Sequence, residues 1–99
     1  MTHLPDQASA NQLAQALLQE GLAACVNIQS PCTSIYHWQG KIVTASEIPV
    51  QIKTLLAYYP EVESQIKALH PYELPEIVYV HVDGGEQAFI QWIYQETRD

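Results

Sequence analysis

The stretch that determines the fold of the second half of the chain is His70-Pro71-Tyr72-Glu73-Leu74-Pro75-Glu76. Both prolines fix φ, and each disfavours the helical conformation in the residue before it. A helix that arrives from Glu61 must therefore stop at Leu69, and the β-branched run from Ile77 to Val82 predicts a strand. The corner between them gathers an imidazole, a phenol and two carboxylates, which suits either a polar site or a structural turn.

Apolar residues at helical spacing predict three helices: one near the N-terminus, one after the middle of the chain and one at its end. The first helix follows the capping residue Asp6, buries one face that includes Leu17 and Leu18, and ends before Gly21. The second begins near Pro60, which suits a first helical position. The closing helix covers residues 86–97.

The region between the first two helices has the composition of strands. Residues 24–28 and 33–38 predict two short strands separated by a bend at Ser30-Pro31. Gln39-Gly40 fits a tight hairpin turn, and a long return strand follows from Lys41 to about residue 56. Pro49 lacks an N–H donor, so the ladder is expected to be interrupted or at an edge there.

The resulting order, a strand stub and then helix, strand, strand, helix, strand and helix, matches the split βαβ arrangement called ferredoxin-like. We therefore expect one α+β domain over residues 1–99, with an antiparallel sheet and helices on one of its faces. The hairpin is too long for so small a domain. Its apolar side chains, among them Ile35, Trp38 and Ile42, indicate a contact with another subunit.

Composition excludes several functional classes. Four basic and eleven acidic side chains give a net charge of −7, and the basic residues are scattered, which argues against nucleic-acid binding. No apolar run is long enough to span a membrane, and no signal peptide is recognisable, so we expect a cytoplasmic protein. Cys25 and Cys32 are too few for a disulfide framework and are read as reduced thiols.

Four blocks of sequence resemble the CutA family of divalent-cation tolerance proteins, in that family's order and spacing. They are Leu22-Ala23-Ala24-Cys25-Val26-Asn27-Ile28, Ser34-Ile35-Tyr36-His37-Trp38-Gln39-Gly40-Lys41-Ile42, Ile52-Lys53-Thr54 and His70-Pro71-Tyr72-Glu73-Leu74-Pro75-Glu76-Ile77, with Trp92 closing the series. The resemblance runs from about Pro5 to the C-terminus. It implies a ferredoxin-like subunit, a homotrimer, and binding of copper or another divalent cation.

The resemblance also implies a ligand set for the metal. The family uses a thiol near the end of its first strand, the histidine of the H-P-Y segment and the glutamate that ends this segment. His70 and Glu76 match the last two, whereas Thr2 occupies the position of the thiol. Leu69 occupies the position just before the H-P-Y histidine, where the family often has a further histidine. Imidazole and carboxylate suit Cu(II), Zn(II) or Ni(II), and a third ligand is expected from elsewhere, such as a neighbouring subunit.

Other interpretations stay open beside the metal site. His70 could cap the helix end, and Glu76 could pair with Lys53 or with a backbone N–H. A second functional class is a trimeric small-molecule-binding or signalling module, related in architecture to the PII-like proteins. An enzyme is not expected, because the sequence contains no recognisable nucleophile and base.

Overall fold

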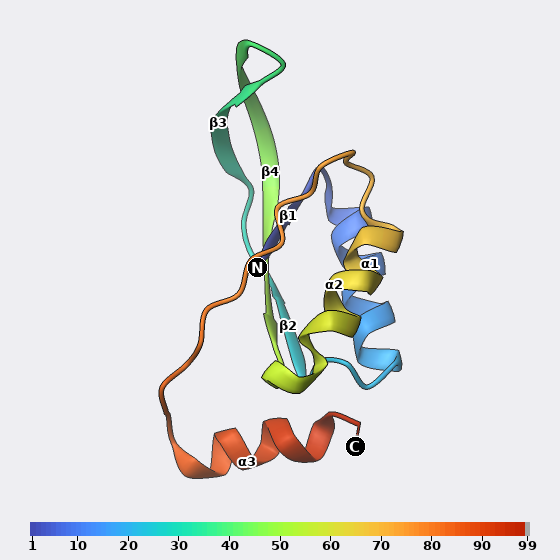
Figure 1. Ribbon diagram of the computed structural model, residues 1–99, viewed down its shortest axis with the longest axis vertical. Coiled ribbons are helices and arrows are strands. Elements are labelled where there is room, and N and C mark those ends of the chain that lie inside the picture. Colours follow the sequence, from blue (N-terminus) through green and yellow to red (C-terminus); the bar gives the residue numbers. More distant parts are fainter. Residues whose placement is uncertain (99) are drawn as a thin grey trace.

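The computed structural model describes residues 1–98 and confirms an α+β fold with an antiparallel sheet (Figure 1). The elements, in chain order, are β1 (Thr2–Leu4), α1 (Gln7–Gln19), β2 (Cys25–Ile28), β3 (Cys32–Trp38), β4 (Lys41–Lys53), a 3-10 turn (Leu56–Tyr58), α2 (Tyr59–Leu69) and α3 (Gln87–Glu96).

The long strand β4 organises the sheet. Its second half lies between β1 and β2, and its first half forms the projecting hairpin with β3 (Figure 1). All three pairings are antiparallel, with Val50 opposite both Thr2 of β1 and Ile28 of β2. The hairpin accounts for the elongated shape of the molecule, which measures 45 × 25 × 22 Å.

β4 changes partner at Pro49, where the sequence predicts an interrupted ladder. The pairing with β3 ends at Glu47, and the pairing with β2 begins at Val50. On this side of β4, Pro49 stands between the two ladders, so its missing N–H removes no ladder hydrogen bond, and on the other side it lies opposite His3 of β1. Its carbonyl still accepts a hydrogen bond from the Gln29 N–H, at 2.9 Å.

The tight hairpin turn is confirmed. Gln39 and Gly40, which connect β3 to β4, have φ values of 50° and 77°. Positive φ at both central residues is the geometry whose twist matches a two-residue hairpin, and glycine adopts it without a steric cost. The projecting part of the sheet is thus specified locally.

Helices α1 and α2 cover one face of the sheet and enclose the core (Figure 1). Asp6 caps α1 as expected, because its carboxylate accepts the Ser9 N–H at 2.8 Å. The core contains one buried stripe from each helix together with the inner face of the sheet: Leu4, Ala10, Leu13, Leu17, Leu22, Ala23, Ile48, Val50, Val62 and Ile66. Leu18, expected on the buried face, is instead 43% exposed.

The expected strand from Ile77 to Val82 is absent, and this prediction is wrong for the described chain. The segment is extended, but it joins the sheet only at Val78, which exchanges two backbone hydrogen bonds with Met1. A strand needs a continuous ladder of backbone hydrogen bonds, and among the described residues this segment has such bonds to the sheet only at Val78.

Helix α3 lies across the end of the body, apart from α1 and α2 (Figure 1). The Glu86 carboxylate caps it by accepting the N–H groups of Ala88 and Phe89. After the helix, the Arg98 N–H donates to the Gly21 carbonyl at 2.9 Å. This bond ties the end of the described chain to the turn after α1.

Two adjacent leucines of α1 provide a matched test of this core. We predict that Leu17→Ala lowers the free energy of unfolding by about 2–4 kcal/mol, because it opens a cavity at a fully buried position. Leu18→Ala should cost less than about 1 kcal/mol, because that side chain already contacts water. Urea denaturation of both variants measures the difference, and equal losses would contradict the assigned helix face.

Candidate functional site

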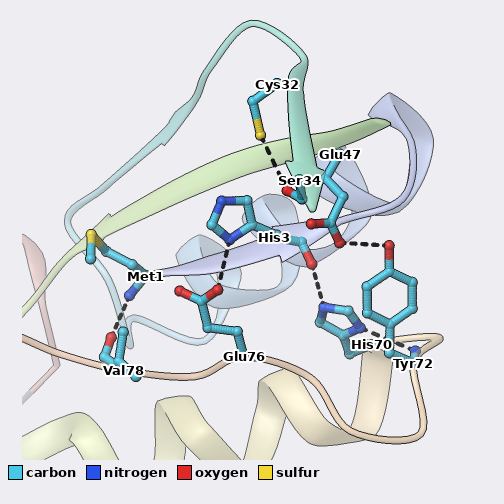
Figure 2. A network of polar contacts seen from close by, with 9 residues as sticks. All are labelled: Met1, His3, Cys32, Ser34, Glu47, His70, Tyr72, Glu76 and Val78. Carbon is cyan, nitrogen blue, oxygen red and sulfur yellow. Dashed lines mark hydrogen bonds and ion pairs between the residues drawn. The ribbon is translucent and has the colours of Figure 1, made fainter. Parts of the chain in front are cut away.

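His70 lies where α2 ends and is almost fully buried, with 8% of its surface exposed. Its backbone N–H closes the last turn of α2 on the Ile66 carbonyl. The ring Nε2 lies 2.7 Å from the backbone oxygen of His3, and the ring Nδ1 lies 3.2 Å from the Tyr72 nitrogen (Figure 2). The ring therefore joins α2, β1 and the Pro71–Pro75 corner.

The partners of His70 determine its tautomer. A carbonyl oxygen only accepts, so Nε2 must carry the proton, and Nδ1 must accept from the Tyr72 N–H. Burial lowers the pKa of His70 below the usual range, and the hydrogen bond to His3 and the charge of Glu47 offset this only in part. The ring is thus neutral at neutral pH, and both of its nitrogens are engaged.

Tyr72 fixes the same corner to β4. Its hydroxyl donates to the Glu47 carboxylate at 2.8 Å, and its ring lies against the His70 ring, with centroids 4.8 Å apart (Figure 2). Burial and the bond to Glu47 raise the pKa of the Tyr72 phenol well above its usual range. The bond satisfies a carboxylate that is itself buried.

Glu76 pairs with His3 and not with His70. The His3 Nδ1 lies 3.2 Å from a Glu76 carboxylate oxygen, within ion-pair distance but without the alignment of a hydrogen bond (Figure 2). The His3 and Glu76 side chains are 27% and 49% exposed, although the His3 Nδ1 atom itself is buried. Lys53, the alternative partner for Glu76, places its ammonium over the Phe89 ring, at 5.8 Å from the centroid.

The described residues do not form a complete metal site. Within residues 1–98 no group of three or more His, Cys, Asp or Glu side chains is placed to hold a metal ion. Thr2, which the resemblance places where a thiol ligand is expected, is buried with its hydroxyl unpartnered, and it points to the opposite face of β1 from His3. A metal at His70 would have to displace either the His3 carbonyl or the Tyr72 N–H.

Glu47 and His3 belong to this network, although the sequence alone pointed to neither. The signal for Glu47 was present, because it is the one charged residue of β4 between Lys41 and Lys53. His3 becomes notable only once β1 and the corner lie side by side, which the sequence does not indicate. Cys32 lies opposite Glu47 in the hairpin, and its thiol contacts the Ser34 hydroxyl at 3.7 Å.

A hollow of about 280 Å³ lies beside the first half of α2, away from this corner. It is lined by Glu20, Leu22, Glu61, Ser64, Gln65 and Arg98. Arg98 pairs there with Glu61, so its charge is already compensated. The buried histidine and its neighbours are therefore separate from this hollow.

Comparison with known proteins identifies the family. The sequence profile described as CutA1 divalent ion tolerance protein matches residues 1–96. The chain belongs to this family. The divalent-cation tolerance protein CutA of Thermus thermophilus is 40% identical over 94 residues, covering 95% of this chain and 91% of the relative. Human protein CutA is 38% identical, and there the match covers 94% of this chain but about half of the relative, 52%.

Solved CutA structures share the fold as well. CutA from Xylella fastidiosa superimposes with a TM-score of 0.95 at 40% identity, covering 98% of this chain and 93% of that one. The Thermus thermophilus protein gives 0.94 at 39% identity, covering 98% and 94%. A relative from Archaeoglobus fulgidus is described as a periplasmic divalent cation tolerance protein. Among residues 1–98, no helix combines the length and apolar character needed to cross a bilayer.

The position of His70 predicts how the stability of this CutA family member depends on pH. A histidine whose pKa is lower in the folded than in the unfolded chain costs no stability above pH 6.5, and the cost grows as the pH falls from 6.5 toward the lowered value, because the unfolded chain then binds more protons. We predict that the free energy of unfolding falls below pH 6.5 and that His70→Gln makes this fall shallower. Urea denaturation between pH 7.5 and 5 measures this pH dependence, with His81→Gln as the exposed control. If the free energy of unfolding of His70→Gln falls as steeply with pH as that of the wild type, His70 is not the cause.

Proposed function

We propose that this chain acts in divalent-cation tolerance as a cytoplasmic homotrimer that binds copper or another divalent cation, without a catalytic step. Its membership of the CutA1 family supports the link to divalent cations. The two free cysteines, which form no disulfide, suit a reducing compartment. Subunit assembly and metal binding are supported by two further features of the structure.

The β3–β4 hairpin supports self-association. Ile35 and Ile42 are 68% and 72% exposed on the projecting hairpin, and Tyr36 and Trp38 are also exposed. A row of large apolar side chains on a two-stranded projection is costly in water and is typical of a surface that another subunit covers. We propose that this hairpin packs against neighbouring copies in the trimer.

The oligomer can be tested directly. We predict that size-exclusion chromatography with light scattering gives three times the 11.2 kDa chain mass, and that Ile35→Asp with Ile42→Asp shifts it toward the monomer. Gln39→Asp is the matched control, because it adds a carboxylate at the exposed turn of the same hairpin. A monomeric wild-type protein would contradict the proposal.

The observation that carries the metal proposal is the 3.2 Å pair of His3 and Glu76 beside the bonded His70. Glu76 and His3 offer oxygen and nitrogen ligands, and His70 could join them only by giving up either its bond to the His3 carbonyl or its bond from Tyr72. Two or three such ligands leave the coordination shell open. We propose that a partner copy completes it, which links metal binding to assembly.

Calorimetric titration of Cu(II) into the untagged protein tests this site. We predict that Glu76→Gln weakens binding by about tenfold or more, because a carboxylate ligand loses its charge. His70→Ala should also weaken binding, whereas His81→Gln, an exposed histidine outside the network, should leave the affinity unchanged. Equal affinity in wild type, Glu76→Gln and His70→Ala would remove both residues from the metal site.

A further inference from the structure

Tyr72 is held at both of its ends, and one of these bonds occupies His70. The Tyr72 backbone N–H donates to the His70 Nδ1 at 3.2 Å, and the Tyr72 hydroxyl donates to a Glu47 carboxylate oxygen at 2.8 Å (Figure 2). The phenol ring between these bonds lies against the His70 ring. A shift of the Tyr72 backbone away from His70 therefore pulls against the bond at the other end of the side chain.

Glu47 is a firm anchor for this bond. It forms the last pair of β4 with β3, opposite Cys32, and the next residue, Ile48, pairs with Leu4 of β1. Glu47 is only 7% exposed, so little water can replace the Tyr72 hydroxyl at its carboxylate. The bond is thus costly to break, and its acceptor is fixed by the sheet on either side.

The Tyr72 N–H excludes a metal ion from both nitrogens of the His70 ring. Nδ1 already accepts this N–H, so a metal ion at Nδ1 would have to displace it. A metal ion at Nε2 would displace the His3 carbonyl, and the ring proton would have to move to Nδ1. There the proton would face the Tyr72 N–H, and two donors cannot share a hydrogen bond. Either nitrogen becomes a ligand only after the Tyr72 N–H has withdrawn.

We propose that Glu47 and Tyr72 are positioning residues that keep His70 out of the coordination shell until the bond between them opens. The inference rests on the metal site proposed above, where His3 and Glu76 supply the first nitrogen and oxygen ligands. Opening the bond adds a second imidazole, a ligand that suits Cu(II), Ni(II) and Zn(II), whereas Mn(II) prefers oxygen ligands. The Tyr72–Glu47 bond therefore sets the selectivity of the site as well as its affinity.

Calorimetric titration of Cu(II) and Mn(II) into untagged Tyr72→Phe tests this role. We expect the Cu(II) affinity to rise about threefold to tenfold, because coordination by His70 no longer works against a held Tyr72, and the Mn(II) affinity to change less. Adding His70→Ala to Tyr72→Phe should abolish the rise. Tyr59→Phe is the matched control, since it removes a hydroxyl that donates to Glu63 at 2.8 Å outside this network, and both affinities should stay unchanged.

Nitrogen NMR of the His70 imidazole gives a readout in the metal-free protein. In Tyr72→Phe the Nδ1 resonance should move toward that of an unprotonated nitrogen without a hydrogen bond, and in Tyr59→Phe it should not move. Tyr72→Phe leaves a buried carboxylate without its donor, so a second variant combines it with Glu47→Leu. This pair of changes removes both partners, leaves no polar group unpaired between them, and should give the same rise in Cu(II) affinity.

The outcomes separate this inference from the metal site on which it rests. Unchanged or weaker Cu(II) binding by both Tyr72→Phe variants, beside measurable binding by the wild type, would overturn the role of Glu47 and Tyr72 alone. A rise that persists when His70→Ala is added would also overturn it. No Cu(II) binding by the wild type or by either variant would overturn the proposed metal site, and this inference with it.

Discussion

The hydrogen bond from the His70 ring to the backbone oxygen of His3 is the constraint on which the rest of the corner depends. It joins the end of α2 to β1 across 67 residues of sequence, in a buried place where an unpaired donor or acceptor would cost about 1–3 kcal/mol. Once it forms, the other ring nitrogen accepts from Tyr72, and Tyr72 in turn reaches Glu47 of β4. The rigid Pro71–Pro75 segment is thereby fixed to both strands, and Glu76 is placed beside His3.

The same bond limits the chemistry of the site. A neutral histidine with both nitrogens engaged is a structural group, and it becomes a metal ligand only by exchanging a hydrogen bond for a coordination bond. No aligned hydrogen bond joins the His3 and Glu76 side chains, so a metal ion bound between them would displace none. Metal binding in this family member is therefore proposed to start from that pair, with His70 supporting the geometry and a partner copy adding ligands.

Local sequence rules predicted much of the fold. The Asp6 cap, the Gln39-Gly40 turn, the end of α2 at Leu69 and the interrupted ladder at Pro49 all depend on neighbouring residues, and each is confirmed. The strand at Ile77–Val82 was wrong because a strand needs a partner, and the described β1 supplies one only at Val78. The pairing of Glu76 with His3 could not be predicted either, since it depends on which segments the sheet brings together.

Nitrogen NMR of the His70 imidazole tests the central claim most directly, because the two ring nitrogens report separately on protonation. At pH 7 the account predicts a neutral ring with the proton on Nε2 and an unprotonated, hydrogen-bonded Nδ1, in the protein without added metal. A ring protonated on both nitrogens, or on Nδ1 alone, would contradict it, because neither form can donate to His3 and accept from Tyr72 together.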